Sequence, residues 1–231
     1  MAILLTGSSR GIGAAILDTL TASGAQVIGH GTRSGIAADF ADPAAPQALW
    51  DAALAQGGGT IDVLVNNAGV FEASPLDRDH DAWVADWERT LRINLTAAAE
   101  LCRLAVRHWQ QSGTGGRIVN IASRAAYRGD SPAHWHYAAA KAGMVAMTKT
   151  IARGYAKEGI LAFAICPGFT MTGMADEYLA SRGGDKLLAD IPLGKVADPQ
   201  EVAAVARFCA LEAPASMTGA VLDVNGASYV R

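Results

Sequence analysis

The stretch AILLTGSSRGIG, residues 2–13, runs from a short apolar segment directly into three closely spaced glycines, Gly7, Gly11 and Gly13. Glycines let a backbone turn sharply and approach a pyrophosphate group closely. A helix that starts at such a turn offers free N–H groups and its positive dipole end to phosphates. The stretch therefore predicts a strand, a turn and a helix that bind a dinucleotide, with a purely structural turn as the alternative.

Beyond this stretch, short apolar runs alternate with longer helix-like segments. The runs are Ala2–Leu5, Gln26–Ile28, Val63–Val65, Ile118–Ile121, Leu161–Ile165 and Val221–Val224. Their brevity and flanking glycines favour buried strands over buried helices. The predicted helices are Gly11–Ala22, Pro43–Ala55, Asp81–Gln110, Trp135–Glu158 and Pro199–Leu211. This alternation predicts an α/β fold, in which helices cover both faces of a parallel sheet.

A further candidate strand, Ala38–Phe40, lies close behind the second apolar run. Only about ten residues separate the two, whereas a crossover between parallel strands usually needs a dozen or more. We therefore expect the helix between the second and third strands to be missing or reduced to a turn.

The bulk properties fit one globular domain spanning residues 1–231. Hydrophobic residues make up 51% of the chain, charged residues 18%, and the net charge of −3 gives no indication of a nucleic-acid surface. No apolar run is long enough to span a bilayer, and no secretory signal is recognised. The three cysteines, Cys102, Cys166 and Cys209, are widely spaced, which favours buried free thiols in a reducing cytoplasm.

The motif Thr-Gly-x3-Gly-x-Gly, residues 6–13, resembles the nucleotide-binding motif of short-chain dehydrogenases/reductases. Asn66-Asn67-Ala68-Gly69, after the Val63–Val65 run, is similar to the NNAG motif of that family. The resemblance covers essentially the whole chain, and its general profile is similar to 3-oxoacyl carrier-protein reductases. It implies a single Rossmann-type, doubly wound sheet of about seven strands in the order 3-2-1-4-5-6-7. It also implies a small carbonyl or alcohol substrate, and a homotetramer or homodimer.

Tyr137 and Lys141 lie four residues apart in a predicted helix, and so on one face of it. With Asn94 and Ser123, they match the family's catalytic tetrad in order, although each residue alone has an ordinary structural explanation. The resemblance implies that Tyr137 is the acid/base and that Ser123 hydrogen-bonds the substrate oxygen. It implies that Lys141 lowers the pKa of Tyr137 and holds the nicotinamide ribose, and that Asn94 supports a proton-relaying water.

A free tyrosine has a pKa of about 10, too high for an efficient base near neutral pH. A lysine charge about 4 Å away supplies roughly 4 kcal/mol at an effective dielectric near 20, enough to lower that pKa by about three units. The spacing from Ser123 to Tyr137 is fourteen residues, where thirteen is commonest in the family. The extra residue puts the substrate geometry in question more than the catalytic assignment.

The segment His30-Gly31-Thr32-Arg33-Ser34 follows the second strand and carries no carboxylate, although NAD sites often place one there. Arg33, helped by Arg10, could hold a 2′-phosphate, which favours NADP (NADPH) over NAD; Arg33 as a solvated loop charge is the alternative. Asp39 resembles the family's adenine-contacting aspartate, or simply caps the next turn. The residues predicted to bind the cofactor are Gly7, Ser9, Arg10, Gly11, Ile12, Gly13, Arg33, Asp39, Phe40, Asn67, Ala68, Gly69, Tyr137, Lys141, Pro167, Gly168, Thr170 and Thr172.

After the sixth strand, residues 167–172 resemble the segment that closes over the nicotinamide, with Thr170 in place of the family's usual aliphatic residue. Residues 172–195 are predicted to form a lid that excludes water. Arg124 and Arg128 could attract an anionic substrate, but solvent-facing charges are favoured. His134 and His136 have no third ligand cluster, so we expect no metal site, and no Gly-x-Ser-x-Gly elbow supports a hydrolase triad.

These patterns together predict an oxidoreductase that transfers a hydride between NADP and a carbonyl or alcohol. A dehydratase or epimerase that reuses the same dinucleotide and tyrosine is one alternative. A nonenzymatic dinucleotide-sensing protein is another, although such proteins often lose the tyrosine or the lysine, and both are present here.

Overall fold

Strands from the whole length of the chain form one parallel sheet of seven strands, in the order β3-β2-β1-β4-β5-β6-β7. The computed structural model describes residues 1–171 and 184–231. The strands are β1 (Ala2–Leu5), β2 (Gln26–Gly31), β3 (Ile36–Ala37), β4 (Val63–Asn66), β5 (Gly116–Ile121), β6 (Ile160–Pro167) and β7 (Val221–Val224). This architecture confirms the predicted doubly wound fold and its strand order.

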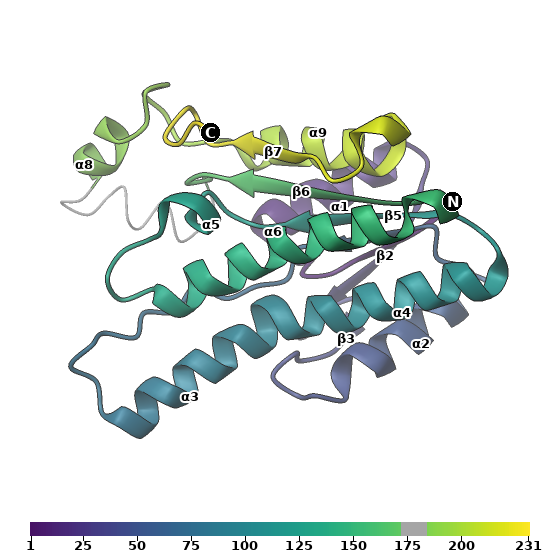
Figure 1. Cartoon of the computed structure of the whole chain (residues 1–231), viewed down its shortest axis with the longest axis horizontal. Coiled ribbons are helices and arrows are strands. Elements are labelled where there is room, and N and C mark those ends of the chain that lie inside the picture. Colours follow the sequence, from purple (N-terminus) through teal and green to yellow (C-terminus); the bar gives the residue numbers. More distant parts are fainter. Residues whose placement is uncertain (172–183) are drawn as a thin grey trace.

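Helices cover both faces of the sheet (Figure 1). The α-helices are α1 (Gly11–Ala22), α2 (Ala45–Gln56), α3 (His80–Leu91), α4 (Ala97–Ser112), α5 (Ala125–Arg128), α6 (Trp135–Tyr155), α8 (Gly184–Ala189) and α9 (Pro199–Arg207). Two π-helical turns follow α3 and α9, at Arg92–Thr96 and Phe208–Glu212, and 3-10 turns occur at Ala156–Glu158 and Ala215–Met217. Helices α1 and α9 pack together on one face, whereas α2, α4 and α6 lie on the other.

The strands are buried on both faces, because successive side chains of a strand point to opposite sides of the sheet. In β1, Leu4 belongs to the hydrophobic core under α2, α4 and α6, while Ile3 and Leu5 belong to the core under α1 and α9. The central strands β4 and β5 divide in the same way. Two cores therefore share one sheet, as expected for a parallel sheet with helices on both faces.

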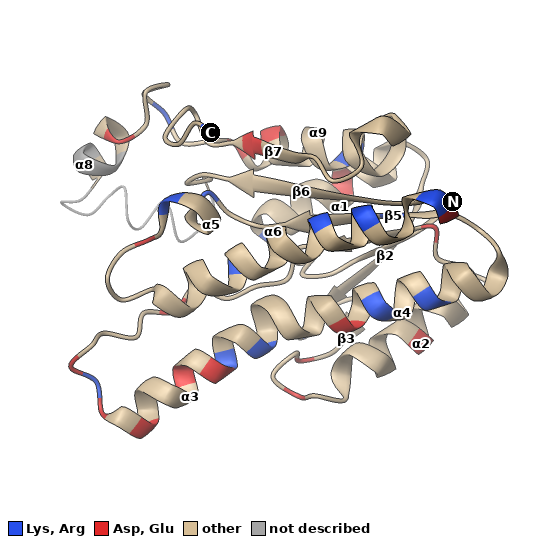
Figure 2. Ribbon diagram, in the orientation of Figure 1, with Lys and Arg blue, Asp and Glu red and all other residues tan. Residues whose placement is uncertain are grey.

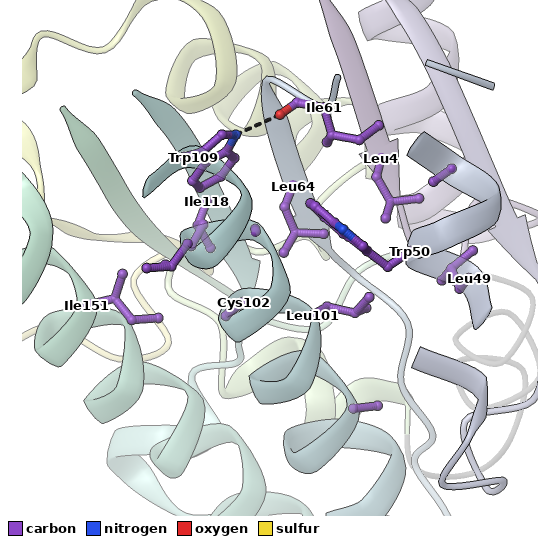
Figure 3. Packing of buried hydrophobic residues seen from close by; sticks show 14 of the residues in the cluster. Leu4, Leu49, Trp50, Ile61, Leu64, Leu101, Cys102, Trp109, Ile118 and Ile151 are labelled. Atoms are coloured by element: carbon purple, nitrogen blue, oxygen red, sulfur yellow. Dashed lines mark hydrogen bonds between the residues drawn. The ribbon is translucent and has the colours of Figure 1, made fainter. Parts of the chain in front are cut away.

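Trp109, near the end of α4, anchors the first of these cores (Figure 3). Its indole Nε1 donates a hydrogen bond of 2.7 Å to the carbonyl oxygen of Ile61, just before β4. The indole also occupies the space beside Gly116 that a Cβ would need. The end of α4 is thereby fixed against the starts of β4 and β5.

The third strand lies earlier than predicted. β3 is Ile36–Ala37, so the prediction of a strand at Ala38–Phe40 is wrong. The chain leaves the sheet at Asp39, whose carboxylate accepts a hydrogen bond from the Ala41 N–H and forms a turn. The crossover between β2 and β3 is reduced to residues 32–35 and contains no helix, which confirms the shortened connection.

The predicted helix Asp81–Gln110 is continuous but not uniform. The π-helical turn Arg92–Thr96 separates α3 from α4 and contains Asn94, which is fully buried. π-helical turns of this kind are frequent at functional sites. The sequence pattern did not reveal this turn, because one extra residue in a single turn hardly changes the helical spacing of the apolar residues around it.

Candidate active site

The carboxyl ends of β1, β4, β5 and β6 meet at the same edge of the sheet, where open α/β sheets bind ligands. At the end of β1, Gly7 has a φ of +67°, and a Cβ there would lie 2.7 Å from the Cα of Ala68. A Cβ at Gly13 would collide with the Gly7 carbonyl oxygen. Arg10, at the N-cap of α1, makes no capping hydrogen bond with its side chain. This close-packed turn, ending at a helix N-terminus without a side-chain cap, fits a pyrophosphate group.

Asn67 fastens the segment after β4 to the glycine turn. Its side-chain amide donates to the carbonyl oxygens of Thr6 (3.0 Å) and Gly7 (2.9 Å). The Thr6 hydroxyl in turn accepts hydrogen bonds from the backbone N–H groups of Asn67 and Ala68, both at 3.0 Å. Asn67, predicted as a cofactor-binding residue, thus uses its side chain to set the shape of the turn.

His30, near the end of β2, is a residue of this site that the sequence analysis missed. Its Nδ1 accepts a hydrogen bond of 3.3 Å from the Gly7 N–H, and its Nε2 lies 3.0 Å from the Ala38 carbonyl oxygen. The imidazole stacks on Phe40 at 4.5 Å and is buried. Burial lowers the pKa of His30, which favours the neutral ring that these two hydrogen bonds require. The charges of this segment do not mark His30, because its role depends on packing against Phe40.

Two serine hydroxyls border Gly31, at the end of β2. A Cβ at Gly31 would lie 2.8 Å from the Oγ of Ser34 and 3.5 Å from the Oγ of Ser9. The glycine turn and the short loop 32–35 therefore meet at this point, and each carries an exposed arginine there, Arg10 and Arg33. Asp39 lies just beyond, where its side chain is engaged in the turn described above.

The predicted tetrad gathers at the ends of β4 and β5. Ser123, just after β5, hydrogen-bonds the hydroxyl of Tyr137 from α6. Lys141 is buried, and its Nζ donates to the Ile121 carbonyl oxygen at 2.8 Å. Asn94 hydrogen-bonds both the N–H and the carbonyl oxygen of Val70, each at 2.8 Å.

Gly69 joins these side chains to the NNAG segment. A Cβ at Gly69 would lie 3.3 Å from the Oδ1 of Asn94 and 3.6 Å from the Nζ of Lys141. The structure thus brings all four tetrad residues and the NNAG segment together, as their order in the sequence suggested.

Burial shifts the pKa values of Tyr137 and Lys141. It raises the pKa of Tyr137 to about 12, partly offset by the hydrogen bond from Ser123, and lowers the pKa of Lys141 to about 8. The pKa of Tyr137 thus moves opposite to the direction that the sequence suggested. Lys141 lies 5.8 Å from the centre of the Tyr137 ring and is not among the groups that shift that pKa. At neutral pH the phenol is protonated.

The end of β6 closes the site on a third side. The Gly168 N–H donates to the Val224 carbonyl oxygen at 2.9 Å, and the buried Thr170 hydroxyl donates to the Gly168 carbonyl oxygen at 3.2 Å. Thr172 and the first half of the predicted lid lie outside the described residues. Of the lid, α8 and residues 190–195 are described, and Ile191 and Leu188 pack near Phe169.

Arg124, directly after Ser123, is buried, so the favoured expectation of a solvent-facing charge is wrong for this residue. Arg128 is partly exposed and donates to Asp190 at 2.6 Å.

Ser123 hydrogen-bonds Tyr137, whereas the nearby His134 bonds Ser131 at 2.6 Å, an arrangement unlike a Ser-His-Asp triad. Among the described residues, no group of three or more histidine, cysteine or acidic side chains could hold a metal. No described helix has the length and apolar character that crossing a bilayer requires.

Comparisons with known proteins find relatives along nearly the whole chain. The family profile described as enoyl-(acyl carrier protein) reductase matches residues 29–227. The 3-oxoacyl-(acyl-carrier-protein) reductase FabG of Vibrio cholerae is 34% identical, over 98% of this chain and 96% of its own length. The D-threitol dehydrogenase of Mycolicibacterium smegmatis is also 34% identical, over 99% of this chain and 92% of its own length.

A solved structure extends the comparison to three dimensions. It is a candidate 2-deoxy-D-gluconate 3-dehydrogenase from Agrobacterium tumefaciens with bound NADP. The two structures are 28% identical in sequence, with a TM-score of 0.88 over all of this chain and 96% of the other.

Proposed function

Because the chain belongs to the short-chain dehydrogenase/reductase family, we propose that it is an NADP-dependent enzyme that transfers a hydride between the nicotinamide and a carbonyl or alcohol substrate. The observation that carries the proposal is the meeting of Ser123, Tyr137 and Lys141 beside a glycine turn shaped for a pyrophosphate. The named substrates of the relatives include an acyl chain on a carrier protein and a sugar alcohol, so they do not identify the substrate of this chain.

The cofactor, when bound, supplies the hydride in reduction and accepts it in oxidation. Tyr137 acts on the substrate oxygen, where reduction creates negative charge and requires a proton. Its raised pKa keeps the phenol protonated at neutral pH, which is the form that donates. Ser123, already hydrogen-bonded to Tyr137, orients the same oxygen, and Lys141 holds the nicotinamide ribose.

The preference for NADP rests on the two arginines at the corner formed by Gly31. Arg10 and Arg33 are exposed on neighbouring segments, and the segment from His30 to Gly35 carries no carboxylate. A 2′-phosphate between two guanidinium groups gains charge-assisted hydrogen bonds that a 2′-hydroxyl cannot make. We propose that this corner binds the 2′-phosphate, with Asp39 and Phe40 near the adenine.

Titration of the protein's fluorescence with NADPH and NADH tests the cofactor assignment. The wild-type protein is expected to bind NADPH more tightly, and Arg33→Ala is expected to remove most of that preference. Arg153→Ala, which changes an exposed arginine on α6, serves as the control. Tighter binding of NADH would refute the role of Arg33, and binding of neither would refute the dinucleotide site.

A screen of carbonyl compounds with NADPH tests the reaction. Tyr137→Phe is expected to keep NADPH binding and to lower turnover by about 10²- to 10⁴-fold. Product formed without net consumption of NADPH would instead identify a dehydratase or an epimerase. NADPH binding without turnover of any compound would favour a dinucleotide sensor.

Three further proposals concern the whole chain. The family resemblance supports a homotetramer or homodimer, which light scattering on the eluting protein would measure. The packing of residues 188–196 near Phe169 supports the assignment of residues 172–195 as a lid over a single domain. We also propose that the enzyme works in the cytoplasm, as three buried free thiols suggest.

A further inference from the structure

Arg124 is the most unusual charge beside the catalytic residues. It follows Ser123 directly, and its side chain is only 10% exposed. Its Nη1 is fully buried and has no hydrogen-bond partner among the described residues. A buried guanidinium group with an unused donor is costly, because burial removes water without replacing the lost hydrogen bond. Such a group is expected where a ligand supplies the partner.

The surroundings of Arg124 already contain one carboxylate, but at a distance. Asp190, just after α8, lies 3.6 Å from the Nη1 of Arg124, too far for a hydrogen bond, and makes its short contact of 2.6 Å with Arg128 instead. Two guanidinium groups thus face one carboxylate, and repulsion from Arg128 adds to burial in lowering the pKa of Arg124. Asp130 also lies near enough to oppose this shift. A second planar anion at Arg124 would give each of the two guanidinium groups a carboxylate of its own.

Arg124 lies at the same edge of the sheet as the catalytic candidates. The Arg124 N–H bonds the Pro167 carbonyl oxygen at 2.9 Å, and its guanidinium lies 5.3 Å from the centre of the Phe169 ring. Arg124 therefore joins the strand end that carries Ser123 to the segment after β6. Figures 1 and 2 show α5 at the same end of the molecule as α8.

We propose that Arg124 binds the carboxylate of the substrate, so that this site acts on short oxo or hydroxy acids, and that Asp190 stands in for that carboxylate in the free protein. The inference rests on the proposed hydride-transfer function. Because Ser123 and Arg124 are adjacent in the chain, the end of β5 supplies both the hydroxyl expected at the substrate oxygen and the cation proposed for its acid group. Asp190 is 46% exposed, and an ion pair so open to water is displaced at little cost.

Steady-state kinetics with NADPH, short oxo acids and their uncharged methyl esters tests the assignment. Arg124→Gln is expected to raise the KM for the acids roughly tenfold to a hundredfold, as for a lost charged hydrogen bond, and to leave the esters nearly unchanged. Asp190→Asn is expected to lower the KM for the acids, because it removes the competing carboxylate. Arg153→Gln, at an exposed site on α6, is the matched control.

The proposal would be overturned if Arg124→Gln raised the KM for acids and for esters equally. It would also be overturned if Asp190→Asn raised the KM for acids. Calorimetric titration with malonate, a nonreacting dicarboxylate, separates this proposal from the proposed function. Malonate binding that Arg124→Gln abolishes, in a protein that reduces no carbonyl, would support the carboxylate site and refute the reductase. Turnover of carbonyls with equal KM values for acids and esters would support the reductase and refute the carboxylate site.

Discussion

At the scale of one residue, the buried charge of Lys141 lowers the free energy of unfolding of the protein. Its ammonium group is buried and donates to the Ile121 carbonyl oxygen at 2.8 Å, yet burial still lowers its pKa to about 8. In the unfolded chain a lysine has a pKa of about 10.4. Below pH 8 both states carry the proton, and the folded state bears the full cost of a buried charge.

This pKa difference predicts how stability depends on pH. Between about pH 8 and pH 10 the unfolded chain keeps a proton that the folded chain has lost, so the free energy of unfolding rises with pH. Over this window, Lys141 is expected to contribute a rise of up to about 3 kcal/mol, which Lys141→Met removes. Urea denaturation from pH 7 to pH 10 measures it, with Lys157→Met as the exposed control. Parallel profiles for the wild type and Lys141→Met would contradict the buried charge.

His30 leads to a prediction on the acid side. Burial holds the pKa of His30 below 6.5, so above that pH both the folded and the unfolded chain are neutral at this residue. As pH falls below 6.5, the unfolded chain binds a proton first, and stability is lost through the interval down to the folded pKa. His30→Asn keeps an acceptor for the Gly7 N–H without titrating, and is expected to lose less stability than the wild type between pH 7 and pH 5.

Urea denaturation at half-unit steps of pH measures this difference. Burial also lowers the pKa of His134 and of His136, so His134→Asn is the matched comparison, since it removes a histidine that does not touch the glycine turn. If His30→Asn followed the wild-type profile, the imidazole would not be held neutral by its contacts with Gly7 and Ala38.

Individual site residues were predictable where they belong to a motif, and not where they depend on packing. Tyr137, Lys141, Ser123 and Asn94 follow one another at recognisable spacings, and the structure brings them together. His30 and Arg124 belong to no such pattern. Their roles depend on burial and on partners from distant segments, which one sequence does not reveal.

At the scale of elements, the π-helical turn Arg92–Thr96 is the feature that aims Asn94 at the NNAG segment. The side-chain oxygen of Asn94 accepts a hydrogen bond from the Val70 N–H, and its side-chain nitrogen donates one to the Val70 carbonyl oxygen. Asn94→Ala would leave that partly buried N–H and carbonyl without partners, at about 2 to 4 kcal/mol of unfolding free energy. NADPH affinity is expected to fall as well, because Gly69 and the residues before it lose their support.

Chemical denaturation and NADPH titration of the same variant measure the two effects. Thr96→Ala, an exposed position in the same turn, is expected to change stability by less than about 0.5 kcal/mol. A similar loss in both variants would assign the effect to a general disturbance of the π-helical turn rather than to the hydrogen bonds of Asn94.

The boundaries of the elements were predicted well where hydrophobic runs are long, and poorly where local hydrogen bonds decide. β6 and α6 fall close to their predicted positions. β3 does not, because the Asp39 turn ends the strand and Phe40 packs on His30 instead of joining the sheet. The short helix α5, between Ser123 and Gly129, has too few residues to produce a periodic signal.

At the scale of the whole molecule, the sheet order was predictable because the alternation of strands and helices runs through the entire chain. The reactivity of the three free cysteines measures whether the two faces of the sheet unfold together. Cys102 lies in the core under α2, α4 and α6, Cys209 in the core under α1 and α9, and Cys166 in a third cluster beside α6. Each cysteine therefore reports on a different part of the interior.

If residues 1–231 form one domain, all three thiols are expected to become reactive at the same urea concentration, because cooperative unfolding exposes every core at once. Burial raises the pKa of Cys102 to about 12 and those of Cys166 and Cys209 to about 11, so little labelling is expected in native buffer. Pulsed alkylation followed by mass spectrometry gives a midpoint for each cysteine. An earlier midpoint for Cys209 would show that the α1 and α9 face opens as a separate unit. The glycine turn that leads into α1 would then lie on the less stable face of the sheet.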